Sequence, residues 1–159
     1  MELTNKRDRT MELTEIRIKL IRDKADKLRA FASVTIDQTL VIRDLKIIEG
    51  THGLFVAMPS RKLCDRCHSC GGKNHLRARH CNDCGSKLRE MRGRIDERGR
   101  PRLYADIAHP INQEARDYVQ GKVVVAYQAE KERSLEAGYV ATTFDDLDYE
   151  YYDQVEADV

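Results

Sequence analysis

The sequence predicts an α+β protein with a small antiparallel sheet of four to five strands and a C-terminal helix. Apolar and polar residues alternate between residues 13 and 58, which is the period of half-buried strands. After residue 110, apolar residues recur at the spacing of one helix. A cysteine-rich segment separates this helix from the first four strands. With 159 residues, the chain is expected to hold one modest core and an appendage.

The first four predicted strands form a meander joined by turns at residues 37–39 and 50–53. In the third strand the apolar positions change register, which indicates a bulge near Asp44 or burial on both faces. Residues 54–58 form the fourth strand. The alternating apolar residues are Ile16, Ile18 and Leu20, then Ala30, Ala32, Val34 and Ile36, then Leu40, Ile42, Leu45 and Ile47.

A fifth strand at residues 104–108 and a helix are expected after the insert. Asn112 is the predicted N-cap of this helix, and Glu114 is favourably placed in its first turn. Gly121 inside the helix costs roughly 1 kcal/mol relative to alanine. We expect the apolar stripe to lie on the sheet. Its predicted members are Ile111, Ala115, Tyr118, Val119, Lys122 and Ala126.

The net charge of +1 results from cancellation between segments. Residues 61–102 carry 13 basic and 5 acidic side chains, whereas residues 129–159 carry 2 and 10. A polyanion responds to the electrostatic potential of charges within a Debye length of about 8 Å, and not to the net charge of the whole chain. The basic segment therefore favours binding of nucleic acid. The sequence shows neither an apolar run suited to a membrane span nor a signal-peptide pattern, so we expect a cytoplasmic protein without membrane contact.

All five cysteines lie between positions 64 and 84, with the ligand spacing of a tetrahedral zinc site. Two overlapping C-x-x-C pairs compete in the first half of this segment. The chain turns tightly after the second cysteine of such a pair, and Gly71 and Gly85 tolerate the positive φ of that turn. This leaves Cys64 as the spare thiol. The predicted ligands of a structural Zn²⁺ ion are Cys67, Cys70, Cys81 and Cys84.

Other interpretations of the cysteine segment remain open. His80 or His75 could replace one cysteine, iron could occupy the site, or the thiols could be free in a disordered loop. Four thiolates leave no open coordination position, so the predicted site is structural. His109 has no nucleophile or second carboxylate at useful spacing, and we expect neither enzyme activity nor a small-molecule substrate.

Five strings of residues carry a family resemblance. They are LTEIR from Leu13, ASVTID from Ala32, VIRDLKIIEG from Val41, GLFVAMPS from Gly53 and DIAHPIN from Asp106. In this order they resemble the stage V sporulation protein G (SpoVG) family of bacterial septation regulators. The resemblance implies a small antiparallel sheet with a C-terminal helix, a homodimer, and binding to DNA and, in some members, RNA. It assigns nucleic-acid contact to the basic pair Arg61 and Lys62.

The chain departs from this family pattern in two places. About 40 residues replace a short loop, and an acidic segment of about 30 residues follows the helix. A hairpin connection tolerates insertion because its two ends already lie close together. The predicted parts are an N-terminal extension (1–10), a discontinuous SpoVG-like domain (11–60 and 103–128), a basic zinc ribbon (61–102), and an acidic tail (129–159) that is a helical extension or disordered.

The predicted function is a nucleic-acid-binding protein that regulates transcription in septation or sporulation. The candidate contact residues are Arg61, Lys62, Arg66, Lys73, Arg77 and Arg79. Arginines in the glycine-rich links up to Arg102 are expected to form a flexible arm that orders on binding. The alternative function is a protein-interaction adaptor whose ribbon docks an acidic partner. A further hypothesis is that the acidic tail competes with nucleic acid for the ribbon.

Overall fold

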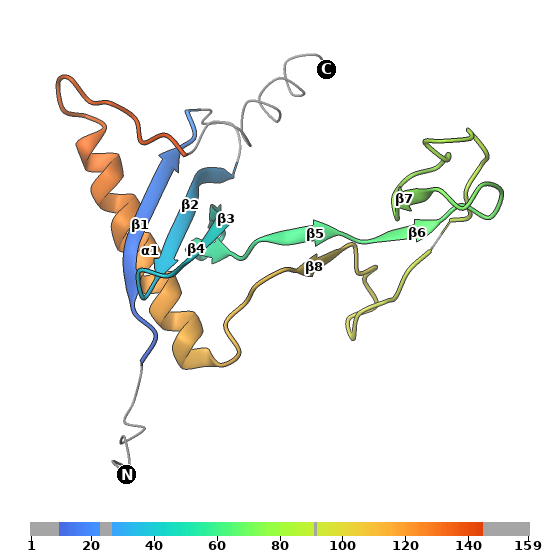
Figure 1. The fold of residues 1–159 in the computed structure, drawn as a ribbon, viewed down its shortest axis with the longest axis horizontal. Coiled ribbons are helices and arrows are strands. Elements are labelled where there is room, and N and C mark those ends of the chain that lie inside the picture. The colour runs from blue at the N-terminus through green and yellow to red at the C-terminus, as the bar shows by residue number, and fades with distance from the viewer. Residues whose placement is uncertain (1–9, 23–26, 91, 145–159) are drawn as a thin grey trace, which may run out of the picture. The chain divides into compact units, whose positions relative to one another are not determined.

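The computed structural model describes residues 10–22, 27–90 and 92–144 (Figure 1). The chain divides into two compact units. The sheet-helix unit consists of the described parts of Met1–Met58 and Pro110–Val159, and the cysteine unit is Pro59–His109. Most of the predicted N-terminal extension, residues 1–9, and the end of the predicted acidic tail, residues 145–159, lie outside the described residues.

A four-stranded antiparallel sheet forms the sheet-helix unit together with one helix, which confirms the predicted α+β class. Each strand pairs antiparallel with the next one in the chain, and short turns join β2 to β3 and β3 to β4. Asp37 and Gln38 occupy the turn between β2 and β3 with positive φ angles of 48° and 55°. The strands are β1 (Leu13–Leu20), β2 (Leu28–Ile36), β3 (Leu40–Gly50) and β4 (Gly53–Ala57).

The bulge predicted near Asp44 is present in β3. Ala32 pairs with Leu45 and Val34 pairs with Ile42, so two residues of β3 lie opposite one residue of β2. Asp44 has a φ of 62°, which asparagine and aspartate tolerate better than most residues. Because of this extra residue, Ile42 and Leu45 both pack in the core despite their odd spacing.

The helix α1 (Gln113–Arg133) packs against the sheet, as predicted (Figure 1). The Oδ1 atom of Asn112 accepts a hydrogen bond from the backbone N–H of Ala115 at 2.8 Å, which confirms the predicted N-cap. The buried positions are Val119, Val123 and Tyr127, which recur every fourth residue and face the core. No helix within the described residues has the length and apolarity needed to cross a membrane.

The start of the helical stripe differs from the prediction. Ile111 is 89% exposed and precedes the helix, so it is not part of the apolar stripe. The helix continues beyond residue 128 to Arg133, so residues 129–133 form a helical extension, one of the two predictions for the start of the tail. Glu130 stabilises the last turn, because its carboxylate accepts hydrogen bonds from Arg133 at 2.8 Å and from the Tyr139 hydroxyl at 2.6 Å. The hydrogen bond from Arg133 is the main cause of the lowered pKa of Glu130.

The core of the sheet-helix unit can be tested at Leu45, which is 0% exposed. We expect Leu45→Ala to lower the free energy of unfolding by about 2–5 kcal/mol, because it removes buried methyl groups and leaves a cavity. Leu40 is 57% exposed in the same strand, so Leu40→Ala is the matched control and should change little. Urea unfolding followed by circular dichroism measures the free energy of unfolding of both variants. Similar losses in the two variants would contradict this description of the core.

The predicted fifth strand does not join the four-stranded sheet. Its first three residues form β8 (Tyr104–Asp106), which pairs with β5 (Ser60–Lys62) in a separate two-stranded sheet of the cysteine unit. A third small sheet pairs β6 (Cys64–Arg66) with β7 (Lys73–His75). These short strands carry Arg61, Lys62, Arg66 and Lys73 of the candidate site, and the four predicted cysteine ligands lie in the turns outside them.

Candidate metal centre and basic ribbon

Each C-x-x-C pair of the cysteine unit closes the same backbone turn. In the first turn, the N–H of Cys67 donates to the carbonyl of Gly72 at 2.8 Å, and the N–H of Gly71 donates to the carbonyl of Cys67 at 2.9 Å. The second turn repeats both bonds at the same distances, with Gly85 in the position of Gly71. Both glycines have a φ of 74°, which confirms the predicted need for glycine after each pair.

The two turns bring the four predicted ligands together, with all four sulfur atoms within 4.8 Å of one another. The sulfur atoms of Cys67 and Cys84 lie 3.7 Å apart, and those of Cys70 and Cys81 lie 3.6 Å apart. These thiols are free, and four sulfurs at the usual Zn–S distance of about 2.3 Å would form a tetrahedron with edges of about 3.8 Å. The cluster therefore has the donor set and spacing to hold one metal ion.

Hydrogen-bond donors surround the sulfur atoms. The backbone N–H of Ser69 lies 3.3 Å from the Cys67 sulfur, and the N–H of Gly72 lies 3.4 Å from the Cys70 sulfur. The Ser86 hydroxyl lies 3.2 Å from the Cys84 sulfur. Donors in these positions stabilise thiolates, which are the form that binds metal.

The thiol pKa values differ within the cluster. The backbone N–H of Cys84 and then the Asn74 amide lower the pKa of Cys81 to about 6. Ser86 lowers the pKa of Cys84 through its hydroxyl and its backbone N–H. The Gly72 N–H lowers the pKa of Cys70. The neighbouring cysteine sulfurs have the opposite effect and outweigh it, so the pKa of Cys70 is raised to about 12. Without a metal ion, ionisation of one thiol therefore makes ionisation of its neighbours less favourable. A divalent cation would stabilise all four thiolates together.

Asn74 holds the two turns together. Its side chain is buried, and its Nδ2 atom donates to the carbonyl of Gly72 at 3.2 Å and lies 3.3 Å from the Cys81 sulfur. Its Oδ1 atom accepts from the N–H of Asn82 at 2.8 Å. The sequence alone does not indicate this role for Asn74, because an asparagine in a polar loop gives no periodic signal that would distinguish it from an exposed one.

The competing ligand candidates lie outside the cluster. Cys64 is exposed, and its sulfur lies 3.7 Å from the carbonyl oxygen of Lys62. The Nδ1 atom of His75 accepts a hydrogen bond from the backbone N–H of Arg77 at 3.0 Å. Among the described residues, no histidine joins the four sulfurs, and His80 is exposed.

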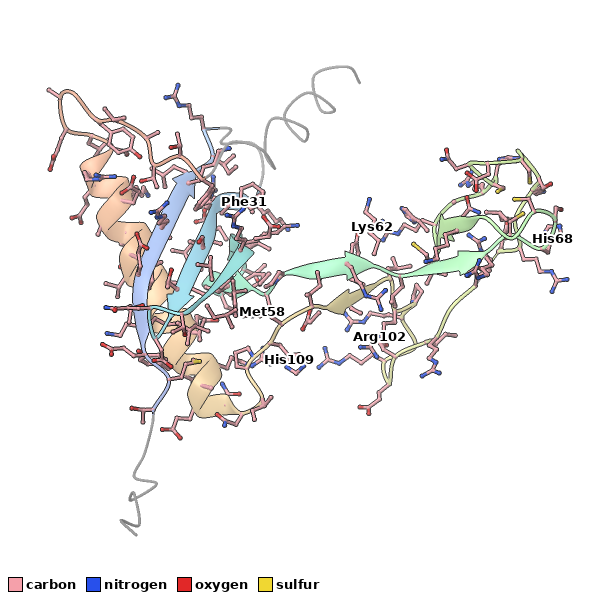
Figure 2. The ribbon with its side chains drawn as sticks, viewed as in Figure 1. Phe31, Met58, Lys62, His68, Arg102 and His109 are labelled. Carbon is pink, nitrogen blue, oxygen red and sulfur yellow. The ribbon has the colours of Figure 1, made fainter. Side chains whose placement is uncertain are left out.

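The predicted nucleic-acid contacts are exposed basic side chains on the short strands and turns of the cysteine unit. Figure 2 shows Lys62 on β5, His68 in the cysteine-rich turn, and Arg102 on the segment that precedes β8. Arg66 also has a structural role, because its Nη1 atom donates to the carbonyl of Gly71 at 3.2 Å. The exposed set is Arg61, Lys62, Arg66, Lys73, Arg77 and Arg79.

The flexible arm predicted after the cysteines is wrong for residues 92–102. The side chain of Arg92 is only 10% exposed, and its Nη1 atom lies 3.1 Å from the carboxylate of Asp65. Its Nη2 atom donates to the carbonyls of His75 at 3.1 Å, Leu76 at 3.4 Å and Ala78 at 2.9 Å. Backbone hydrogen bonds then close the following residues into a hairpin.

Comparison with known proteins identifies the family. The SpoVG family model matches residues 11–129. A relative named "Putative septation protein SpoVG" from Caldicellulosiruptor bescii is 36% identical over 119 residues, which cover 75% of this chain and 93% of the relative. The protein of the same name from Agathobacter rectalis is 34% identical over 122 residues, covering 77% and 98%. The chain therefore belongs to the SpoVG family.

Proposed function

We propose that this protein is a nucleic-acid-binding regulator of septation or sporulation whose basic ribbon, organised by Zn²⁺, contacts the phosphate backbone. The observation that carries the proposal is the exposure of six basic side chains in the same compact unit as the four-sulfur cluster. Phosphate contacts of this kind supply most of the affinity of proteins for nucleic acids. The names of the family relatives support the link to septation.

Zn²⁺ is the ion that this donor set suits best. Four cysteine sulfurs around one ion form a closed, structural site, and zinc accepts tetrahedral coordination without redox chemistry. The ion would supply cross-linking and folding energy to the cysteine unit. The protein supplies the two glycine turns, the N–H donors and the Asn74 bridge, which orient the sulfur atoms before the ion binds.

The cysteine unit remains basic when the ion is counted. Residues 61–102 carry a net charge of +8, and four thiolates with one divalent ion subtract two charges. Arginine dominates this segment, and its planar guanidinium group binds phosphate oxygens in pairs. Arg61 and Lys62 are successive residues of β5, so their side chains leave opposite faces of the ribbon.

We also propose that the protein is a cytoplasmic homodimer. A reducing compartment keeps the clustered thiols available for metal. In the described sheet, β1 and β4 are the edge strands, and Phe55 on β4 is 42% exposed. A small core with open sheet edges gains stability when a second copy covers an edge.

The basic pair provides the first test of nucleic-acid contact. We expect Arg61→Gln/Lys62→Gln to weaken binding to duplex DNA and to reduce the slope of log K against log salt by about 1.8, since each phosphate contact contributes about 0.9. The measurement is fluorescence anisotropy over a salt series.

The matched control is Lys46→Gln/Arg116→Gln, which removes the same charge from exposed positions of the sheet-helix unit. An equal change in slope for both double variants would contradict a specific role of β5. Absence of any binding to DNA and RNA by the wild-type protein at low salt would instead favour the adaptor function.

A further inference from the structure

We propose that residues 92–102, the arginine hairpin, form a second phosphate-binding element, and that Arg92 fixes this hairpin to the metal-binding turns. This inference rests on the proposed function, because it assigns a further contact surface for the same nucleic acid.

The hairpin is ordered by its own backbone. The N–H of Arg102 donates to the carbonyl of Arg94 at 2.8 Å, and the N–H of Asp96 donates to the carbonyl of Arg100 at 2.8 Å. The Asp96 carboxylate closes the turn, because its Oδ1 atom accepts from the N–H groups of Arg98 at 2.9 Å and Arg100 at 2.8 Å. The hairpin therefore presents its side chains in a defined arrangement before any ligand binds.

The arginine side chains of this hairpin are not equivalent. The Nε atom of Arg100 lies 3.1 Å from the Asp96 carboxylate, which neutralises it. Arg94, Arg98 and Arg102 are exposed, and none of them forms an ion pair within the part of the chain that the structure describes.

The position of two of these arginines is electrostatically unfavourable in the free protein. Ile95 bridges to Pro101, so Arg94 and Arg102 are the next positions across the hairpin. Like charges directly opposite each other destabilise a strand pair. A polyanion would remove this repulsion by binding between and along the two guanidinium groups, which makes the phosphodiester backbone the ligand class that fits.

The attachment of the hairpin leaves little freedom at its base. The Arg92 guanidinium donates to three carbonyls between the last residue of β7, His75, and Ala78. At Gly93, with a φ of 105°, an added Cβ would lie 2.7 Å from the Cδ1 atom of Leu76. These contacts therefore fix the direction of the chain at the base of the hairpin and the distance between the hairpin and the metal-binding turns.

Arg92 itself cannot serve as a phosphate contact, because its side chain is 10% exposed and already bound to protein oxygens. We describe it as a positioning residue. Its role would be to hold the exposed arginines of the hairpin in a constant register with those around the metal site, so that both groups bind one nucleic-acid backbone at once. Loss of this register lowers the number of phosphates contacted simultaneously.

The first experiment removes the exposed charges of the hairpin. We expect Arg94→Gln/Arg98→Gln/Arg102→Gln to reduce the salt slope for duplex DNA by about 2.7. The matched control, Lys46→Gln/Arg116→Gln/Lys131→Gln, removes the same charge from exposed positions of the sheet-helix unit and should change the slope much less. All of these side chains are exposed, so neither variant depends on repacking a core. Equal slopes for the two triple variants would overturn the hairpin as a contact surface.

The second experiment tests the positioning role. We expect zinc-loaded Arg92→Met to keep one metal per chain and still to lose salt slope, although the replaced side chain touches no phosphate. Arg89→Met, which removes one exposed charge from a neighbouring position, should lower the slope by at most about 0.9. An unchanged slope in Arg92→Met, or loss of its metal, would overturn the positioning role.

The two proposals fail in different ways. If the wild-type protein binds neither DNA nor RNA, the proposed function itself is wrong. If it binds and the Arg61/Lys62 double variant reduces the slope while the hairpin variant does not, only the hairpin inference is wrong.

Discussion

Replacing Cys67 with serine is expected to abolish metal binding and to unfold the cysteine unit while the sheet-helix unit stays folded. The buried cluster of the cysteine unit consists of Cys67, Cys81 and Leu88, with Ala78 packed against it, which is too little apolar area to hold 51 residues. Structural zinc sites supply about 10–16 kcal/mol of binding energy to such small units. Metal content and nuclear magnetic resonance spectra of the Cys67→Ser protein measure the two effects.

The matched control is Cys64→Ser, because Cys64 lies in the same segment but outside the four-sulfur cluster. This variant should retain one metal ion per chain and the resonances of the cysteine unit. Loss of metal in both variants, or a cysteine unit that stays folded in Cys67→Ser, would contradict the assigned ligand set.

Replacing Asn74 with alanine is expected to lower the affinity for zinc by about 10–100-fold without changing the number of ions bound. The substitution removes the amide that lies 3.3 Å from the Cys81 sulfur and the acceptor that holds Asn82. Both turns would then be less well oriented before the ion binds, and the pKa of Cys81 would rise towards its ordinary value. Competition with a chelator of known affinity measures the change.

Asn82→Ala is the control for this effect, because Asn82 is exposed and takes part in the bridge through its backbone N–H. Its zinc affinity should stay close to that of the wild-type protein. Equal affinities for Asn74→Ala and wild type would show that the amide bridge does not support the metal site.

The predicted elements that the structure confirms depend on local patterns. Period-two alternation specifies the four strands, the odd offset locates the bulge at Asp44, and Asn112 caps the helix. The choice of cysteine pairs followed from Gly71 and Gly85, because a tight turn with positive φ restricts the residue type. In each case, one short stretch of sequence carries the physical constraint.

The elements that could not be predicted depend on contacts between distant residues. β8 has the alternation of a strand, but its partner is β5, and no local pattern specifies which strand it pairs with. Arg92 looks like the other arginines of a basic segment, because its acceptors are backbone carbonyls that any residue could provide. Its burial is visible only once the turn from His75 to Ala78 is folded around it.

The most direct test of the whole account is the binding of zinc-loaded and chelated protein to matched DNA and RNA over a salt series. We expect the zinc-loaded protein to bind with a steep salt dependence. Chelation should lower both affinity and slope, because the exposed arginines lose their common framework. Equal affinity and slope with and without zinc would contradict the claim that a metal-organised ribbon binds the phosphate backbone.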